Sequence, residues 1–173
     1  MATDFLNVIE RALMMGVSDT INGLTDSENI HVFGEFPESE DLKFPAVIVQ
    51  QTGSGFEEQM MGQKITMGST AGTGEIYGVS YTIHIICEKE SQVQVKSANS
   101  SAGDVYYKQR RLLNWLMLNV ANSVSDLNWD VYEEENSQVL ERHLESWGNI
   151  GFIPELQWYG ASADFLLTFT NIR

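Results

Sequence analysis

The feature that most constrains the fold of this chain is the alternation of side chains over residues 76–89. Every second position carries an apolar side chain, and the intervening positions include the polar residues Ser80, Thr82 and His84. The apolar set consists of Val79, Tyr81, Ile83, Ile85 and Cys87. Because successive side chains of a β-strand point to opposite faces, this pattern is typical of a strand with one face against a core. We therefore expect a sheet that is covered on one face.

Two segments with helical periodicity are expected to provide that cover. Residues 3–24 and 104–124 repeat apolar side chains every three or four positions, which predicts amphipathic helices. Thr3 and Asp104 are the predicted N-caps, and Gly23 lies where a C-terminal cap can form. The predicted inner stripes are Phe5, Ile9, Ala12, Leu13, Val17, Ile21 and Leu24 in the first helix, and Val105, Gln109, Leu112, Leu113, Leu116, Val120 and Val124 in the second.

Shorter segments complete the predicted sheet. Strands are predicted where β-branched and aromatic side chains dominate, at 30–33, 44–51, 127–132 and 163–172. Three further segments are a polar connection at 91–103, a strand or short helix at 138–147, and a loop at 148–160, where Gly148, Gly151, Pro154 and Gly160 occur. The order helix, strands, helix, strands predicts an α+β fold: a mostly antiparallel sheet with two helices packed on one face. The 173 residues are expected to form a single domain, 1–173.

Residues 53–78 form an unusual glycine-rich segment. They hold seven of the 14 glycines, between short apolar stretches. The pattern predicts either a long β-hairpin arm with its tip in Gly68 to Gly74 or an ordinary flexible loop. An arm without a core of its own needs a neighbouring surface to bury its apolar side chains. The predicted subunit-interface residues of the arm are Phe56, Met60, Met61, Ile65 and Met67.

The charge balance is strongly acidic. The chain has 24 acids and 10 bases, which gives a net charge of −14. This argues against a protein that grips nucleic-acid phosphates or anionic lipid, because both depend on Lys and Arg. Cys87 is the only cysteine, so an intrachain disulfide is impossible. The first residues lack the basic region of a signal peptide, and we expect a cytosol-like compartment and no membrane contact.

Candidate catalytic and metal sites are weak. Glu141, His143 and Glu145 share one face if their segment is a strand, but a solvated polar face explains them better than a metal site. The glycines from Gly68 to Gly74 lack the Gly-Lys-Ser/Thr of a phosphate loop. His84 and Cys87 point to opposite faces of one strand and cannot act as a catalytic pair. We therefore expect no catalysis, no cofactor and no metal.

The chain has one dense basic group, Lys108, Arg110 and Arg111, near the start of the second predicted helix. It could contact DNA, or it could pair with acids of the same or a neighbouring chain. The net charge of −14 favours the second interpretation.

The layout as a whole resembles a known family. The strand "FPAVIVQQ" is followed by the glycine-rich segment, the long strand "YGVSYTIHIICEKE", the helix "DVYYKQRRLLNWLMLNVANSV", the strand "LNWDVYEEE" and the end "YGASADFLLTFTNIR". This order is similar to that of the tail-terminator (neck) proteins of tailed bacteriophages. The resemblance implies a small α+β fold and a homo-hexameric ring at the head-proximal end of the tail, where it joins the tail to the head connector.

The resemblance also implies partners. These are further copies of the chain, the tail tube, possibly a sheath protein, and the head–tail connector, with a location in the virion and in the host cytoplasm during assembly. DNA would pass through the lumen without specific binding. We expect acids to line that lumen, with Glu133, Glu134 and Glu135 and the acids between Asp26 and Asp41 as candidates. The alternatives are another neck, connector or sheath-adaptor subunit, or a small cytosolic enzyme or binding domain.

Overall fold

The computed structural model describes residues 5–25, 30–56, 63–67, 70–96, 105–127 and 137–172. Several predictions lie outside these residues: the N-caps Thr3 and Asp104, most of the strand at 127–132, Met60 and Met61, the tip residues 68 and 69, and Glu133 to Glu135. In parts of the described strands only the backbone path is described, including residues 54–56, 63–67 and 70–76.

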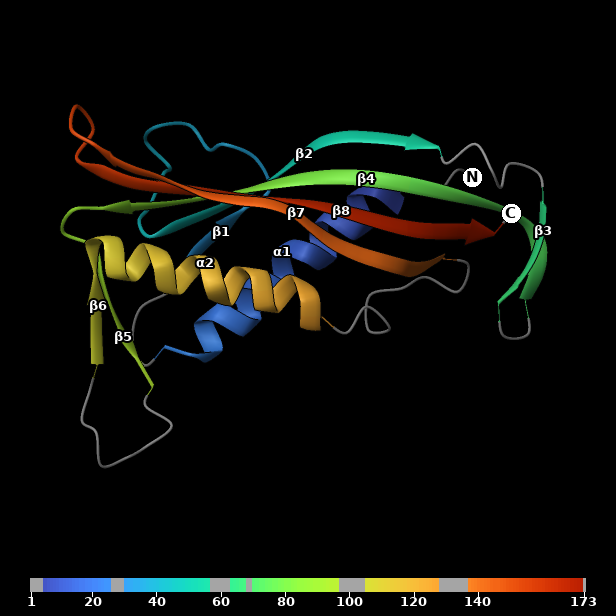
Figure 1. Ribbon diagram of the computed structural model, residues 1–173, viewed down its shortest axis with the longest axis horizontal. Helices are drawn as coiled ribbons and strands as arrows, with labels where there is room; N and C mark the ends of the chain where they lie inside the picture. Colours follow the sequence, from blue (N-terminus) through green and yellow to red (C-terminus); the bar gives the residue numbers. More distant parts are fainter. Residues whose placement is uncertain are drawn as a thin grey trace.

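The described residues form two helices and eight strands, in an order that alternates one helix with a group of strands (Figure 1). The helices are α1 (Phe5–Gly23) and α2 (Gln109–Asp126). The strands before α2 are β1 (His31–Phe33), β2 (Ala46–Phe56), β3 (Gln63–Met67), β4 (Thr70–Glu88), β5 (Gln92–Val95) and β6 (Val105–Lys108). The strands after it are β7 (Ser137–Ile153) and β8 (Trp158–Ile172).

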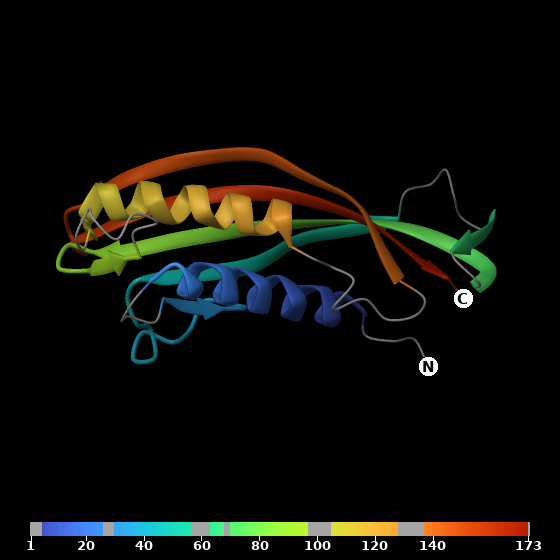
Figure 2. The ribbon, with the colours of Figure 1, turned by 90° about the horizontal axis from the view of Figure 1, so that it is seen from below.

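The main sheet has the strand order β1-β2-β4-β8-β7, and β3 pairs with the first part of β4. All its pairs are antiparallel except β1 with β2. Figure 2 shows both helices on the same face, with α1 over the β1–β2 side and α2 over the β8–β7 side. The predicted α+β class, a mostly antiparallel sheet with two helices on one face, is confirmed.

The core lies between this face and the helices. The five alternate residues from Val79 to Cys87 are buried, as the period of two predicts. Tyr81 lies opposite Gln51 on β2 and Phe165 on β8, so the long strand is at the centre of the sheet. From Ile9 onward, the members of the two predicted helix stripes are buried with three exceptions: Leu24 is exposed, Val105 belongs to β6, and Gln109 is exposed at the start of α2.

The segment before α2 corrects the sequence prediction. Residues 105–108 form β6 and pair with β5 in a second, two-stranded sheet, so the helix begins later than predicted. Gln109 has a φ of 51°, which turns the chain from the strand into the helix. The side chains of Val93 and Tyr107 lie opposite each other in this ladder and pack at the core, and cross-strand pairs of this kind stabilise a hairpin.

The loop predicted at 148–160 is also wrong. β7 continues to Ile153 and β8 begins at Trp158, so only four residues connect the strands. The register shifts between Asn149 and Gly151, and Gly151 has a φ of 89°. A residue in this conformation at a β-bulge is most often a glycine. Glycines that suggest a loop in the sequence therefore lie within, or at the start of, long paired strands.

The end of α1 is tied to the strands around it. The Asn22 side chain accepts a hydrogen bond from the Ile30 backbone N–H (2.7 Å) and donates one to the Ile30 carbonyl (3.2 Å). The Lys96 ammonium donates to the carbonyl of Gly23 (3.3 Å), where a cation is favourable at a helix C-terminus. Neither described helix is long and apolar enough to cross a membrane.

Candidate interaction surface

Strand β7 forms one outer edge of the main sheet. It pairs with β8 on one side, and within the described residues no strand lies on its other side. The edge therefore presents backbone N–H and C=O groups along a 17-residue strand that three register shifts interrupt. Long edges of this kind favour pairing with another chain unless charge or a covering element prevents it. Residues 141–148 are all exposed, although Arg142 donates hydrogen bonds to the carbonyls of Ser125 and Leu127 at the end of α2.

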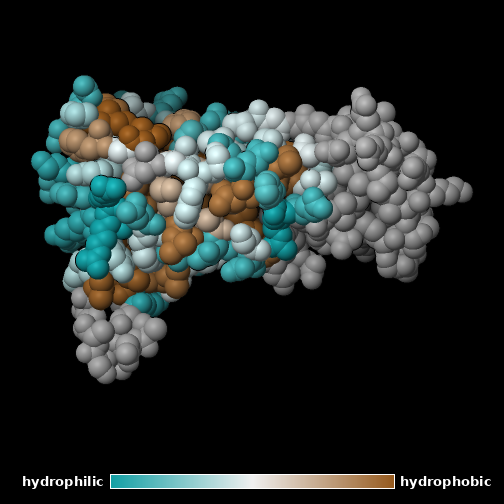
Figure 3. Space-filling view, viewed as in Figure 1, coloured by the Kyte–Doolittle hydropathy of each residue, from teal (hydrophilic) through white to brown (hydrophobic). Residues whose placement is uncertain are grey.

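Several large apolar side chains lie on this edge and its turn. Trp147 is 52% exposed and Ile150, at the register shift between Asn149 and Gly151, is 62% exposed. Leu144, Phe152 and Leu156 are exposed as well. Figure 3 shows apolar side chains at the surface over the end of the sheet where β7 turns into β8. Single exposed apolar residues are ordinary, but a run of them along one uncovered edge is typical of a surface that another protein covers.

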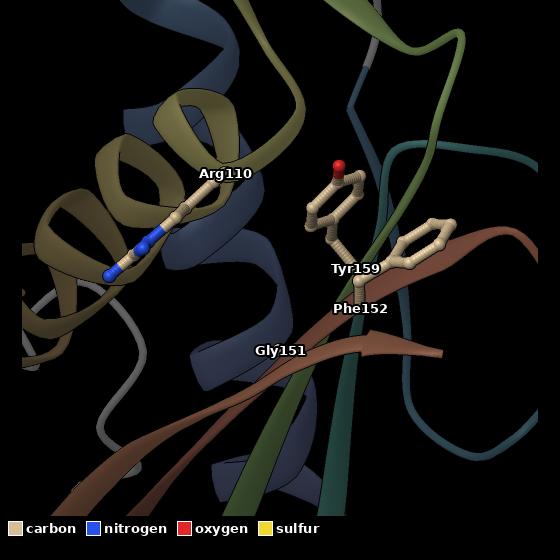
Figure 4. Close-up of a pocket in the computed structure, with 4 residues that line it drawn as sticks. All are labelled: Arg110, Gly151, Phe152 and Tyr159. Atoms are coloured by element: carbon tan, nitrogen blue, oxygen red, sulfur yellow. The ribbon is translucent and has the colours of Figure 1, made fainter. Parts of the chain in front are cut away.

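A pocket of about 420 Å³ lies where this edge approaches α2 (Figure 4). It is lined by Arg110 from the first turn of α2, Gly151 and Phe152 from β7, and Tyr159 from β8. The rings of Phe152 and Tyr159 pack with their centroids 4.8 Å apart. In Figure 4 the guanidinium of Arg110 points away from both rings. The pocket thus has an aromatic wall, formed by Phe152 and Tyr159, and a guanidinium that points away from that wall.

The neighbouring basic residues differ in how they are held. The Arg111 guanidinium lies over the ring of Tyr107, 5.0 Å from its centroid, and Tyr107 in turn stacks on Trp115. This cation–π contact keeps Arg111 against its own chain. Lys108, Arg110 and Arg111 are all exposed, and in the described part of the chain no carboxylate forms an ion pair with Arg110. Arg110 is thus the member of the group that lines the pocket without such a contact.

The face of the sheet opposite the helices carries a polar cluster. Asp164 accepts hydrogen bonds from the Thr82 hydroxyl (2.7 Å) and the Ser146 hydroxyl (2.6 Å). The bond from Ser146, which has the larger effect, and the bond from Thr82 hold the pKa of Asp164 below its usual value. His84 lies 3.3 Å from Gln50 and packs against the ring of Phe36, and burial lowers its pKa although Asp164 opposes that effect.

This cluster ties strands together. Asp164 joins β8 to β4 through Thr82 and to β7 through Ser146, so both carboxylate oxygens are used within the sheet. The described side-chain bond of His84 is to Gln50, not to a hydroxyl that it could activate. The arrangement is therefore suited to fixing the position of β7, and it does not bring a nucleophile and a base together.

The other candidates from the sequence are placed as follows. Cys87 is fully buried, and this burial raises the pKa of its thiol to about 12. Its side chain lies on the opposite face of β4 from that of His84, as predicted. Glu141, His143 and Glu145 are exposed on β7, and the described residues contain no group of three potential metal ligands. Phe56 lies opposite Tyr77, and Ile65 and Met67 lie opposite Gly72 and Thr70. Their predicted contact with a neighbouring subunit stays a prediction.

The β7 edge itself was not predicted from the sequence. The signal was present in Trp147, Ile150 and Phe152, three large apolar residues in a stretch predicted to end in a loop. No protein-family model matches the chain, and no curated protein matches it either. The function is therefore argued from this surface and from the charge of the molecule.

Proposed function

We propose that this protein is a structural subunit of a bacteriophage tail: a tail terminator that forms a homo-hexameric ring at the head-proximal end and joins the tail to the head connector. The observation that carries the proposal is the uncovered β7 edge with its exposed apolar residues. A structural subunit needs such a surface, since its task is to contact copies of itself and neighbouring parts. The resemblance of the chain's layout to the tail-terminator family supplies the particular position in the tail.

The edge favours assembly for a physical reason. Covering the exposed parts of Trp147 and Ile150 removes apolar area from water. Each Å² of apolar area that is buried stabilises the contact by roughly 25 cal/mol. Pairing of the β7 backbone adds hydrogen bonds along the same line. When one surface of a copy binds a different surface of the next copy, the copies assemble head to tail. Such an assembly closes into a ring when the rotation between successive copies brings the last copy back to the first.

The acidic composition supports a ring around DNA. A lumen that carries excess acid repels phosphates, so DNA passes without being held. The described acids Glu38, Glu40 and Asp41 are exposed in the connection between β1 and β2. Glu133, Glu134 and Glu135 remain the other proposed lumen residues. The proposed partners are further copies of this chain, the tail tube, a sheath protein in a contractile tail and the connector.

The mass of the assembled species tests this proposal. Native mass spectrometry on the purified chain, alone and mixed with tail tubes of the same phage, is expected to show a species of six times the 19.4 kDa subunit mass. The genes beside this one identify the tail-tube protein to use. A chain that stays monomeric both alone and on tail tubes would overturn the proposal. A ring found at another position of the neck or baseplate would instead favour a connector or sheath-adaptor subunit.

A further inference from the structure

The opposite edge of the sheet carries a second, acidic surface. β1 has only three residues and pairs with Ala46, Val47 and Ile48, so within the described residues β2 has no neighbour on that side from Val49 onward. A pocket of about 520 Å³ opens at this place. Its lining includes Asn7 and Glu10 from α1, Glu35 and Phe36 after β1, and Gln50 and Gln51 from β2.

The chemistry of this pocket fits a planar cation. Its described lining has two carboxylates and no basic residue. Burial and the nearby Glu35 both raise the pKa of Glu10, so the two acids lie close enough to repel each other. Phe36 is 53% exposed beside them and offers an aromatic face. Two carboxylates next to an aromatic ring suit a guanidinium, which donates paired hydrogen bonds to carboxylate oxygens and stacks on rings.

The occupant can be identified from the rest of the molecule. Arg110 is exposed without an ion-pair partner in the described residues, and it lies beside the β7 edge. The sheet order β1-β2-β4-β8-β7 places the acidic pocket and Arg110 at opposite edges. Figure 2 shows the same separation, since α1 covers the first edge and α2 lies toward the second. The acidic pocket and Arg110 therefore lie at different edges and cannot pair with each other within one molecule.

We infer that the β7 edge of one copy docks on the β1–β2 edge of the next copy, with Arg110 entering the pocket formed by Glu10, Glu35 and Phe36. This contact is head to tail, because each copy uses a different edge on each side. It also brings the exposed aromatic residues of both edges, Phe152 and Phe36, into one interface. The inference rests on the proposed self-association and names the residues that direct it.

A charge-swap experiment tests the pairing. Arg110→Glu and Glu35→Arg change exposed side chains, and each is expected to weaken self-association by about tenfold or more, because a like-charge contact replaces an attractive one. The double variant is expected to restore association to within a few-fold of wild type. Lys89→Glu and Glu38→Arg are the matched controls, since they make the same charge changes at exposed positions outside both pockets. Analytical ultracentrifugation measures association, and circular dichroism confirms folding.

The outcomes separate this inference from the proposed function. If wild type assembles and the swapped single variants behave like their controls, the pairing is wrong and the ring proposal stands. If both single variants weaken assembly and the double variant does not recover, Arg110 and Glu35 are not partners. If EDTA changes assembly while Arg110→Glu does not, the pocket holds a divalent cation and the inference is overturned. A wild-type chain that never assembles, even with tail tubes, defeats the proposed function and this inference together.

Discussion

The hydroxyl of Thr82 on β4 donates a 2.7 Å hydrogen bond to Asp164 on β8, and the same carboxylate accepts a second bond from Ser146 on β7. One side chain thus links three neighbouring strands on the face opposite the helices. Its importance lies in β7, which has no other neighbouring strand in the described chain. The cluster fixes the edge strand from the side that the core does not support.

Asp164→Asn is expected to lower the free energy of unfolding by about 1 kcal/mol, which is less than the roughly 1.5–3 kcal/mol of a bond to a charged group because the site is partly exposed. The bonds from Ser146 and Thr82 lower the pKa of Asp164. Its contribution is therefore present above about pH 4, the pKa of an unfolded aspartate, and is lost as the pH falls through the lower folded pKa.

Urea unfolding at pH 7 and below pH 4 measures this effect. Asp41→Asn is the matched control, because Asp41 is exposed and no hydrogen bond to its side chain is described. Equal stability of the Asp164 and Asp41 variants at pH 7 would show that the cluster does not stabilise the edge.

Leu116 and Leu118 provide a direct comparison on α2. Leu116 is fully buried against the sheet, whereas Leu118 is 51% exposed. Leu116→Ala is expected to cost roughly 2–5 kcal/mol of stability, because it removes buried methyl groups and leaves a cavity. Leu118→Ala is expected to change stability by less than about 0.5 kcal/mol. Thermal or urea unfolding of both variants tests the orientation of α2, and similar losses would contradict it.

Cys87 is expected to be unreactive in the folded protein. Its side chain is fully buried in the central strand, and burial raises the pKa of the thiol to about 12, so little of the reactive thiolate forms at neutral pH. A chromogenic disulfide reagent at pH 8 is expected to label the native chain about a hundredfold more slowly than the chain unfolded in urea. Labelling at the same rate in both states would mean that the β4 core face is open to solvent.

Trp147→Glu is expected to abolish assembly while leaving the fold intact. The side chain is 52% exposed on β7, so its loss costs the monomer little, but a carboxylate there opposes burial of the edge in an interface. Met15→Glu on α1 is the control, since Met15 is also an exposed large apolar residue. Size-exclusion chromatography with light scattering compares the two. Assembly that survives Trp147→Glu and is lost in Met15→Glu would place the interface on the helices instead.

The sequence predicts the centre of this fold well. The alternation from Val79 to Cys87 and the helical spacing of Leu112, Leu116 and Val120 arise from burial on one face, and burial leaves a regular pattern. The same pattern predicts the polar face on which Thr82 and His84 lie, although not their partners Asp164 and Gln50, which come from distant strands.

The edges are predicted poorly, and the reason is physical. β7 buries neither face over residues 141–148, so no period of two marks it, and Gly148, Gly151 and Gly160 suggest a loop. Tertiary pairing with β8 overrides that local signal. The sequence shows Arg110 as part of a basic group, but its position at one edge and that of Glu35 near the other depend on strand order. Strand order is a property of the whole chain.

The most direct test of the proposed function is an image of the assembled phage particle by electron cryomicroscopy at side-chain resolution. Six copies of this chain are expected in a ring at the head-proximal end of the tail, with the β7 edge of each copy covered by its neighbour. A particle that lacks the chain at this position, or a ring in which β7 stays exposed to solvent, would contradict it.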